Sequence, residues 1–427
     1  MPAIPDSVST NTGLLPSIWP QKNIYELLLG ESPLLGIIKK DTGFAETTRN
    51  IAVGYAGNQS MSSTLATAKD NAVANKSVQF GITAKSHYGV FHLDGRLMRM
   101  AKAGGNMAVL IDPLKRASEN LMKQAKRNFS AWLHGNGGAA LGRMTAGSAP
   151  ATATITLTNA ADIRRFEPGM WLQTATTDGT SGTVKAGKVQ VSSVGTEDSP
   201  TITATGNWTA GIGTAAASDY IFLDGTFGAV FNGFDAWNPY WLGGSPSVFA
   251  GVTRTLSPER LAGIPVNCTT FGSTREAIKR LARRVKDAGG KPDLCAISTR
   301  QFEAFTNALE SQGNIVWSKV PSAPVGKVNF GIAYDAVQVM GPSGMIDVVP
   351  DAEMPDDTIR VFTKDTWTLA STGPLFQWIE GAGGGKGLSG LMMENSLDEY
   401  EGRLVSDCEL YCEAPGYNAV GRVVVPT

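Results

Sequence analysis

The stretch from Asp112 to His134 reads DPLKRASENLMKQAKRNFSAWLH, and it is the segment that decides the fold. It predicts one long helix, because Asp112 is a favourable N-cap and Pro113 is tolerated at the first helical position. Gly135 and the glycine-rich residues after it end the helix. One apolar stripe, with steps of three and four residues, is expected to face the core: Leu114, Ala117, Leu121, Ala125, Phe129 and Trp132.

This helix is also basic, and its charges fall largely outside the stripe: Lys115, Arg116, Lys123, Lys126 and Arg127. A helix of about 23 residues spans about 35 Å, roughly twice the usual length in a globular domain. The rest of the chain is typical of β structure and loops. One long strut in such a chain favours a part built for assembly over a catalytic barrel or a doubly wound sheet.

The composition is that of a globular protein with unevenly distributed charge. The chain has 427 residues, 42% hydrophobic and 18% charged, which suits two or three domains. A net charge of −1 argues against a polyelectrolyte binder, yet residues 331–427 hold 15 acidic and 5 basic side chains. This asymmetry favours head-to-tail association of copies or one surface near nucleic acid, and ordinary solvated faces explain it equally well.

Neither a membrane span nor a secretory signal is expected. No run of 18 apolar residues occurs, and the opening MPAIPDSVSTNTGLLPSIWP lacks a charged start and an apolar centre. The four cysteines are therefore expected as cytosolic thiols: Cys268, Cys295, Cys408 and Cys412. Cys408 and Cys412 lie on a strand of period two, about 13 Å apart, which is too far for a disulfide or a shared metal. We interpret both as buried structural thiols.

Three segments besides the helix have a clear character. Residues 1–45 form a proline-rich arm, whose apolar piece NIYELLLGESPLLGIIKKDTGF is expected to lie along another surface. Residues 46–100 predict a long β-excursion, because apolar residues alternate from Val78 to Ile82 and the preceding NQSMSSTLATAKDNAVANKS has little to bury. Residues 146–225 predict a small all-β unit, either a sandwich or a barrel.

Residues 226–427 return to mixed helix and strand. Ser273 and Glu276 form a capping box that opens a helix ending near Ala288. Its inner stripe is Ala277, Ile278, Leu281 and Val285, and its basic residues are Arg275, Lys279, Arg280, Arg283, Arg284 and Lys286. These basic side chains could contact phosphate, but no aromatic residues interleave with them, so a solvated or interface face is favoured.

The histidines do not predict a metal site or a catalytic site. His87 and His92 are five residues apart and so face opposite sides of one strand. His134 lies in the last turn of the long helix, where the helix dipole favours a positive charge. The sequence therefore predicts no catalytic, cofactor-binding or metal-binding residue, and no cofactor.

Two other motifs also favour structural readings. The loop Gly381–Gly387 resembles a phosphate-binding loop, but Glu380 stands where the first glycine is needed, and no serine or threonine follows Lys386. The acidic pairs Asp356-Asp357 and Asp398-Glu399 lie in turn-like stretches, where we expect solvated charge.

The order of these segments resembles that of a tailed-phage major capsid protein of the Hong Kong 97-type fold. The closing stretch EYEGRLVSDCELYCEAPGYNAVGRV adds to the resemblance. It implies an α+β fold with an extended β-loop, a long spine helix, peripheral and axial domains, and an inserted small all-β domain. Carried onto this chain, the parts are an N-terminal arm (1–45), an extended loop (46–100), the spine helix of the peripheral domain (101–145), the inserted domain (146–225), and the rest of the peripheral domain with the axial domain (226–427).

The resemblance implies a structural protein rather than an enzyme. Its copies would form hexamers and pentamers of an icosahedral phage head enclosing double-stranded DNA, assembled in the host cytoplasm. Implied partners are further copies of the chain, a separate scaffolding protein, a portal, a possible decoration protein and non-specifically bound DNA, with no membrane. The alternatives are an encapsulin-like nanocompartment shell and a virion-surface protein for glycan binding or decoration.

The family resemblance also bears on particular basic residues. Some relatives crosslink a lysine to an asparagine, but nothing distinguishes Lys69, Lys76 or Lys85, so crosslinks are not predicted. The basic face of the spine helix would point to the capsid interior. Charge reversal at Lys123, Lys126 and Arg127 is therefore expected to impair assembly or packaging more than folding.

Overall fold

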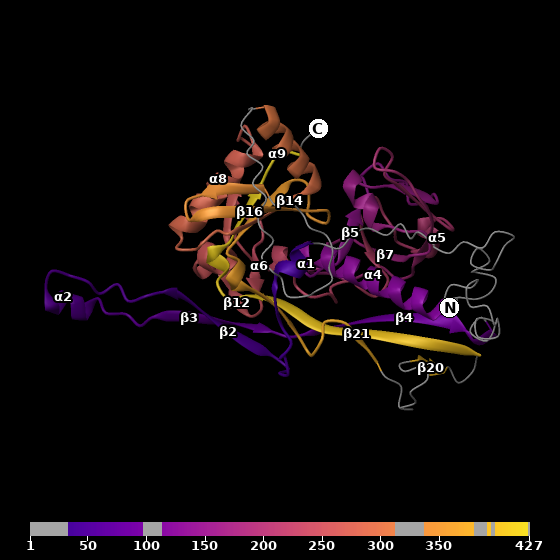
Figure 1. Ribbon diagram of the computed structural model, residues 1–427, viewed down its shortest axis with the longest axis horizontal. Helices are drawn as coiled ribbons and strands as arrows, with labels where there is room; N and C mark the ends of the chain where they lie inside the picture. Colours follow the sequence, from indigo (N-terminus) through magenta and orange to yellow (C-terminus); the bar gives the residue numbers. More distant parts are fainter. Residues whose placement is uncertain (1–32, 97–112, 312–336, 380–390, 394–397, 426–427) are drawn as a thin grey trace.

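A computed structural model describes residues 33–96, 113–311, 337–379, 391–393 and 398–425. The molecule is elongated (Figure 1). A thin hairpin projects from one end, a ribbon of two long strands runs along one side, and two compact lobes stand on the other side. One lobe combines helices with a sheet, and the other is a small β unit.

The projecting hairpin consists of β2 (Arg49–Ala56) and β3 (Lys76–Ile82), paired antiparallel. Its far end carries the short helix α2 (Leu65–Asp70), with Thr64 as N-cap. The base of the hairpin is buried in the main core through Phe80 and Ile82, whereas its far half is exposed. The predicted β-excursion is thus confirmed, with a helical turn that the polar sequence did not reveal.

The long sheet contains six strands: β1 (Lys39–Asp41), β4 (Lys85–Asp94), β18 (Trp367–Ser371), β19 (Gln377–Trp378), β20 (Leu391–Met393) and β21 (Glu399–Cys412). β4 and β21 pair antiparallel over ten residues, from Lys85 opposite Cys408 to Asp94 opposite Glu399. The predicted helix forms as α4 (Pro113–His134) and contacts β4.

The mixed lobe is built on a second six-stranded sheet. Its order is β13 (Ile264–Asn267), β22 (Ala419–Arg422), β17 (Thr358–Phe362), β14 (Leu294–Ser298), β16 (Gly344–Asp351) and β15 (Val337–Gly341). The helices α8 (Thr274–Asp287) and α9 (Thr299–Ser311) contact it. The predicted cap of α8 forms, because Ser273 accepts a hydrogen bond from the Glu276 N–H. At the start of α9, Ser298 accepts a hydrogen bond from the Gln301 N–H.

The β lobe is a six-stranded barrel. Its strand order is β5 (Ala140–Arg143), β10 (Tyr220–Leu223), β7 (Trp171–Ala175), β8 (Val189–Val194), β9 (Thr201–Ala204) and β6 (Thr154–Thr156). A bridge between Met144 and Leu157 joins the two edge strands. The sheet begins ahead of residue 146, because the glycines after α4 turn the chain directly into β5.

Short elements connect these parts. The helices are α1 (Pro33–Ile37), α5 (Trp208–Gly211), α6 (Phe234–Trp237) and α7 (Pro258–Ala262), and β11 (Val248–Phe249) pairs with β12 (Val252–Thr253). Short 3₁₀ helices cover Ala160–Arg165, Arg254–Leu256, Lys364–Thr366 and Pro415–Tyr417.

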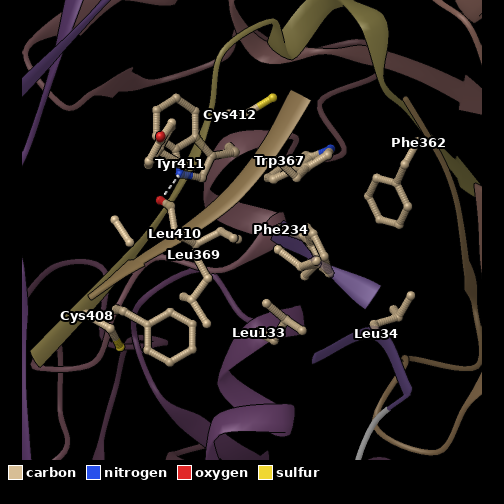
Figure 2. Packing of buried hydrophobic residues seen from close by; sticks show 14 of the residues in the cluster. Leu34, Leu133, Phe234, Phe362, Trp367, Leu369, Cys408, Leu410, Tyr411 and Cys412 are labelled. Atoms are coloured by element: carbon tan, nitrogen blue, oxygen red, sulfur yellow. Dashed lines mark hydrogen bonds between the residues drawn. The ribbon is translucent and has the colours of Figure 1, made fainter. Parts of the chain in front are cut away.

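The main core lies where the long sheet, α4 and the mixed lobe meet (Figure 2). Leu133 of α4 and Phe234 of α6 pack near Trp367 and Leu369 of β18. Leu34 also packs in this core. The sequence predicts that the apolar piece up to Phe44 lies along another surface, and this is wrong for its described part, because α1 and the residues after it are buried within the same chain.

All four cysteines are buried and free, as predicted. Cys408 and Cys412 both lie on β21 and face the main core. Burial raises the pKa of the Cys412 thiol to about 12, so this thiol stays protonated at neutral pH.

Candidate assembly surfaces

The helix α4, here called the spine helix, lies close against β4. A Cβ atom added at Gly89 would stand 3.0 Å from Leu121 Cδ1, so the missing side chain lets the helix approach the strand. Further along, Phe129 and Trp132 pack on His87, with ring centroids 5.3 and 4.9 Å from the imidazole. Three members of the predicted inner stripe therefore face β4.

His87 serves this packing as a neutral ring. Burial lowers its pKa to about 4, and the positive charge of Lys85 lowers it further, against a small opposing effect of Asp407. The ring also meets Phe231, with centroids 5.9 Å apart. An uncharged, mostly enclosed imidazole fits a structural role, in line with the prediction that His87 is no catalytic group.

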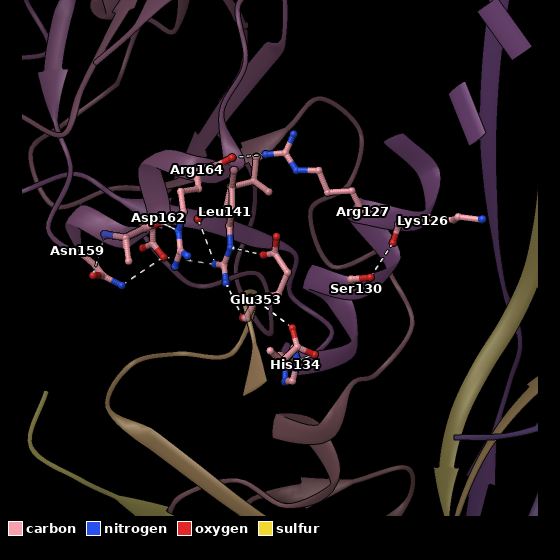
Figure 3. A network of polar contacts seen from close by, with 12 residues as sticks. Lys126, Arg127, Ser130, His134, Leu141, Asn159, Asp162, Arg164 and Glu353 are labelled. Carbon is pink, nitrogen blue, oxygen red and sulfur yellow. Dashed lines mark hydrogen bonds and ion pairs between the residues drawn. The ribbon is translucent and has the colours of Figure 1, made fainter. Parts of the chain in front are cut away.

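The other face of the spine helix meets the barrel, and here one prediction is wrong. Arg127 does not point outward but is buried and ion-paired with Glu167. It also donates a hydrogen bond to the Arg164 carbonyl oxygen (Figure 3). Gln124 donates a second hydrogen bond to Glu167, at 2.7 Å. These partners lie about 40 positions away in the chain, so the local sequence pattern of the helix does not predict them.

A second set of contacts ties the barrel and the spine helix to the mixed lobe. Arg165 of the barrel donates to Glu353, from Nε to Oε2 at 3.1 Å and from a terminal nitrogen to the backbone oxygen at 3.1 Å. His134 Nε2 lies 3.1 Å from Asp351 Oδ2, and both side chains are almost fully buried. His134 therefore links the spine helix to the mixed lobe.

A cleft of about 280 Å³ opens between these three elements. Three arginines line it, and each has a carboxylate partner: Arg165 with Glu353, Arg360 with Asp235 and Arg422 with Asp357. The charges of the cleft are thus already balanced within the chain. We therefore interpret the cleft as a polar contact region between the lobes and not as a binding site for an ionic ligand.

A buried carboxyl group stabilises the loop that connects the barrel to the main core. Glu409 of β21 accepts a hydrogen bond from the Asn232 backbone N–H at 2.8 Å. Burial raises the pKa of Glu409 to about 8, against the lowering effects of Asn232 and Lys85. Lys85 in turn donates to the Val230 carbonyl oxygen at 2.6 Å, so the two side chains hold the same loop.

The far half of the hairpin lies outside the chain's own core. Met61 is 99% exposed and Leu65 is 72% exposed, and Val73 is also open to solvent. Single exposed apolar residues are ordinary, but here they sit on a thin projection that buries almost nothing by itself. Such a surface gains burial only against another molecule.

The remaining candidate motifs have mixed outcomes. The loop Gly381–Gly387 lies outside the described residues. Asp356 is not a solvated turn residue, because it is buried and lies 3.8 Å from Arg300. Asp357 is engaged by Arg422. The local sequence around Asp356 and Asp357 could not predict these ion pairs, because Arg300 lies on α9 and Arg422 lies on β22.

The described residues include neither a cluster of metal ligands nor a helix suited to crossing a membrane. Within them, no three His, Cys, Asp or Glu side chains are grouped as metal ligands. Over the same ranges, no helix is long and apolar enough to cross a membrane.

The projecting hairpin, the spine helix on a two-stranded ribbon and the mixed lobe together define a shell protein of the Hong Kong 97-type fold. A solved structure with this arrangement is the capsid asymmetric unit of cyanophage A-1(L), which is 13% identical, with a TM-score of 0.55 and coverage of 98% of this chain and 100% of that chain. The capsid of an empty GTA particle is 11% identical, with a TM-score of 0.49, covering 99% and 100% of the two chains. An encapsulin complex from Synechococcus elongatus PCC 7942 is 10% identical, with a TM-score of 0.45, covering 100% and 98%.

The sequence itself specifies the family. The model of the SU10 major capsid protein family matches residues 111–384, more than half of the chain, and the chain belongs to this family. No curated protein matches its sequence. The protein is thus a major capsid protein, and its place is the capsid of a virion.

Proposed function

We propose that copies of this chain form hexamers and pentamers of an icosahedral phage head that encloses double-stranded DNA. The observation that carries this proposal is the hairpin of β2 and β3. It extends beyond the subunit's own core and exposes apolar side chains at its far end. A neighbouring subunit would supply the burial that these side chains lack.

The parts of the chain take roles within this proposal. Residues 46–100 would be the extended loop that reaches a neighbour, and residues 101–145 would carry the spine of the peripheral domain. The barrel, predicted as 146–225, would be an inserted domain, and the mixed lobe would be the axial domain near the centre of each capsomer. The role of residues 1–45 is proposed only as an arm, since residues 1–32 lie outside the described part.

A variant of the hairpin tests the assembly proposal. Replacing three exposed apolar residues with serine (Met61→Ser, Leu65→Ser and Val73→Ser) should leave the subunit folded but reduce the yield of shells at least tenfold. A matched control changes three exposed apolar residues elsewhere: Leu242→Ser, Val248→Ser and Leu256→Ser. Circular dichroism would report folding, and sedimentation with electron microscopy would report shells. Normal shells from the hairpin variant would refute the role of the hairpin.

Further partners follow from the same proposal. The chain itself would have no catalytic activity, and a separate scaffolding protein, a portal and a decoration protein would complete the head during assembly in the host cytoplasm. An encapsulin-like compartment is the alternative shell. Particles isolated from an expressing host distinguish the two, because a phage head protects DNA from nuclease whereas a nanocompartment holds a protein cargo.

A further inference from the structure

The helix α8 holds a fixed orientation on the mixed lobe. Its inner stripe is fully buried: Ala277, Ile278, Leu281, Ala282 and Val285. It contacts β17 and β22. Five buried side chains over fourteen residues prevent the helix from turning about its axis, so its outer face stays outward.

That outer face carries a concentrated positive charge. Its six basic residues are Arg275, Lys279, Arg280, Arg283, Arg284 and Lys286, whereas Glu276 and Asp287 are the only acidic residues of the helix. Arg283 lies 3.9 Å from Asp287, and Arg284 contacts Glu259. For the other four, no carboxylate of the described residues lies within 4.0 Å.

Two basic residues of the barrel differ from these four residues of α8, because each has a carboxylate partner. Lys185 and Lys188 each lie 2.6 Å from a carboxylate, of Asp219 and Asp224. Self-pairing is therefore common in this chain, and α8 departs from it. An exposed charge that the described part of the chain leaves unbalanced favours a polyanionic partner.

The spacing of the charges narrows the choice of partner. Arg275, Lys279 and Lys286 lie along one side of the helix, and the first and last are eleven positions apart, or about 16 Å along the axis. Double-stranded DNA carries one negative charge for about every 1.7 Å of its axis, so a straight row of cations can meet several phosphates. The helix has no aromatic residue, so it offers no stacking platform for unpaired bases.

We propose that the outer face of α8 binds the phosphates of packaged double-stranded DNA without sequence preference, and therefore points into the shell. This inference rests on the proposed function, since it takes the enclosed polyanion to be DNA. It assigns the DNA contact to one helix of the mixed lobe, which had been expected only as a solvated or interface face.

Salt-dependent DNA binding by the full-length, unassembled protein tests this assignment. The variant Arg275→Gln, Lys279→Gln and Lys286→Gln removes three charges and keeps helix propensity. Its control removes the same number elsewhere, by Lys188→Gln, Lys291→Gln and Lys364→Gln. Fluorescence anisotropy with a random-sequence duplex, over a series of salt concentrations, gives the slope of log K against log salt.

We expect the α8 variant to lower the magnitude of this slope by about 2 to 3, because each lost phosphate contact removes about 0.9. The control should keep the wild-type slope. Equal slopes for the two variants, or no DNA binding by the wild type, would overturn the proposal. Normal DNA binding by the α8 variant together with a loss of its shells would also overturn the proposal. That result would indicate that the outer face of α8 binds an acidic surface of a second copy. Shell formation by the wild type is measured in parallel, and its failure would refute the proposed function independently of the slopes.

Discussion

The spine helix α4 and the helix α8 are both basic and amphipathic, but their polar faces have different surroundings. Along α4, Arg127 is enclosed by the barrel and His134 by the mixed lobe. Along α8, the basic residues remain on the surface of the subunit. The charged face of α4 therefore connects parts of the subunit, whereas the charged face of α8 is open to solvent. The difference lies in which elements pack beside each helix.

The sharpest test of this comparison is removal of Arg127. We expect Arg127→Met to lower the free energy of unfolding by about 2 to 3 kcal/mol, because Glu167 and the Arg164 carbonyl lose a partly buried charged partner. Urea denaturation measures the change. The matched substitution on α8, Arg283→Met, should cost less than about 0.5 kcal/mol. Equal losses at the two sites would break the comparison.

Acid should loosen the contact of the spine helix with β4. The folded protein holds His87 neutral down to a pKa of about 4, whereas in the unfolded chain it takes up a proton near its ordinary pKa of 6.5. At His87 the unfolded state thus binds more protons between these values, and the contribution of this residue to stability falls by about 2 to 3 kcal/mol as the pH falls from 6.5 to 4.

The variant His87→Phe isolates this effect, because it keeps an aromatic ring against Phe129 and Trp132 but cannot titrate. Its urea midpoint should fall less than that of the wild type between pH 7 and pH 4. An unchanged acid dependence in the variant would show that other groups control the transition. The inner stripe of α8 has no titratable residue and should not contribute.

The smallest expected effect concerns the surface of α8. We expect Lys279→Gln with Lys286→Gln to change the free energy of unfolding by less than about 0.5 kcal/mol, because neither lysine has an ion-pair partner among the described residues. Thermal denaturation measures this. A loss as large as that of Arg127→Met would show that these charges stabilise the subunit, and would remove the contrast between the helices.

Local patterns predicted the elements well. Pro113 and the glycines after His134 set the ends of the spine helix, and Ser273 set the start of α8. Alternation around Val78 predicted β3, and spaced short strands predicted a small all-β unit, of which the structure shows the barrel form. These features depend on residues a few positions apart, so their physical cause is contained in the sequence pattern.

Contacts between elements were predicted poorly. The pattern placed Arg127 on an outward basic face, although its carboxylate partner lies 40 positions away. It placed the apolar piece before Phe44 on another surface, although the described part of this piece, from Pro33 on, packs in the chain's own core. Arg165 and Glu353 are separated by 188 positions, and no local periodicity can pair them.

The sequence by itself determined where helices and strands begin, which side of each is apolar, and that one hairpin has little of its own to bury. Only the tertiary structure decided which polar faces are enclosed. Periodicity reports a preference for burial on one side of an element, whereas the partner of a charge depends on which distant segment packs against it. The sequence predicted a long basic helix, and the tertiary structure shows that this helix connects the barrel to the mixed lobe.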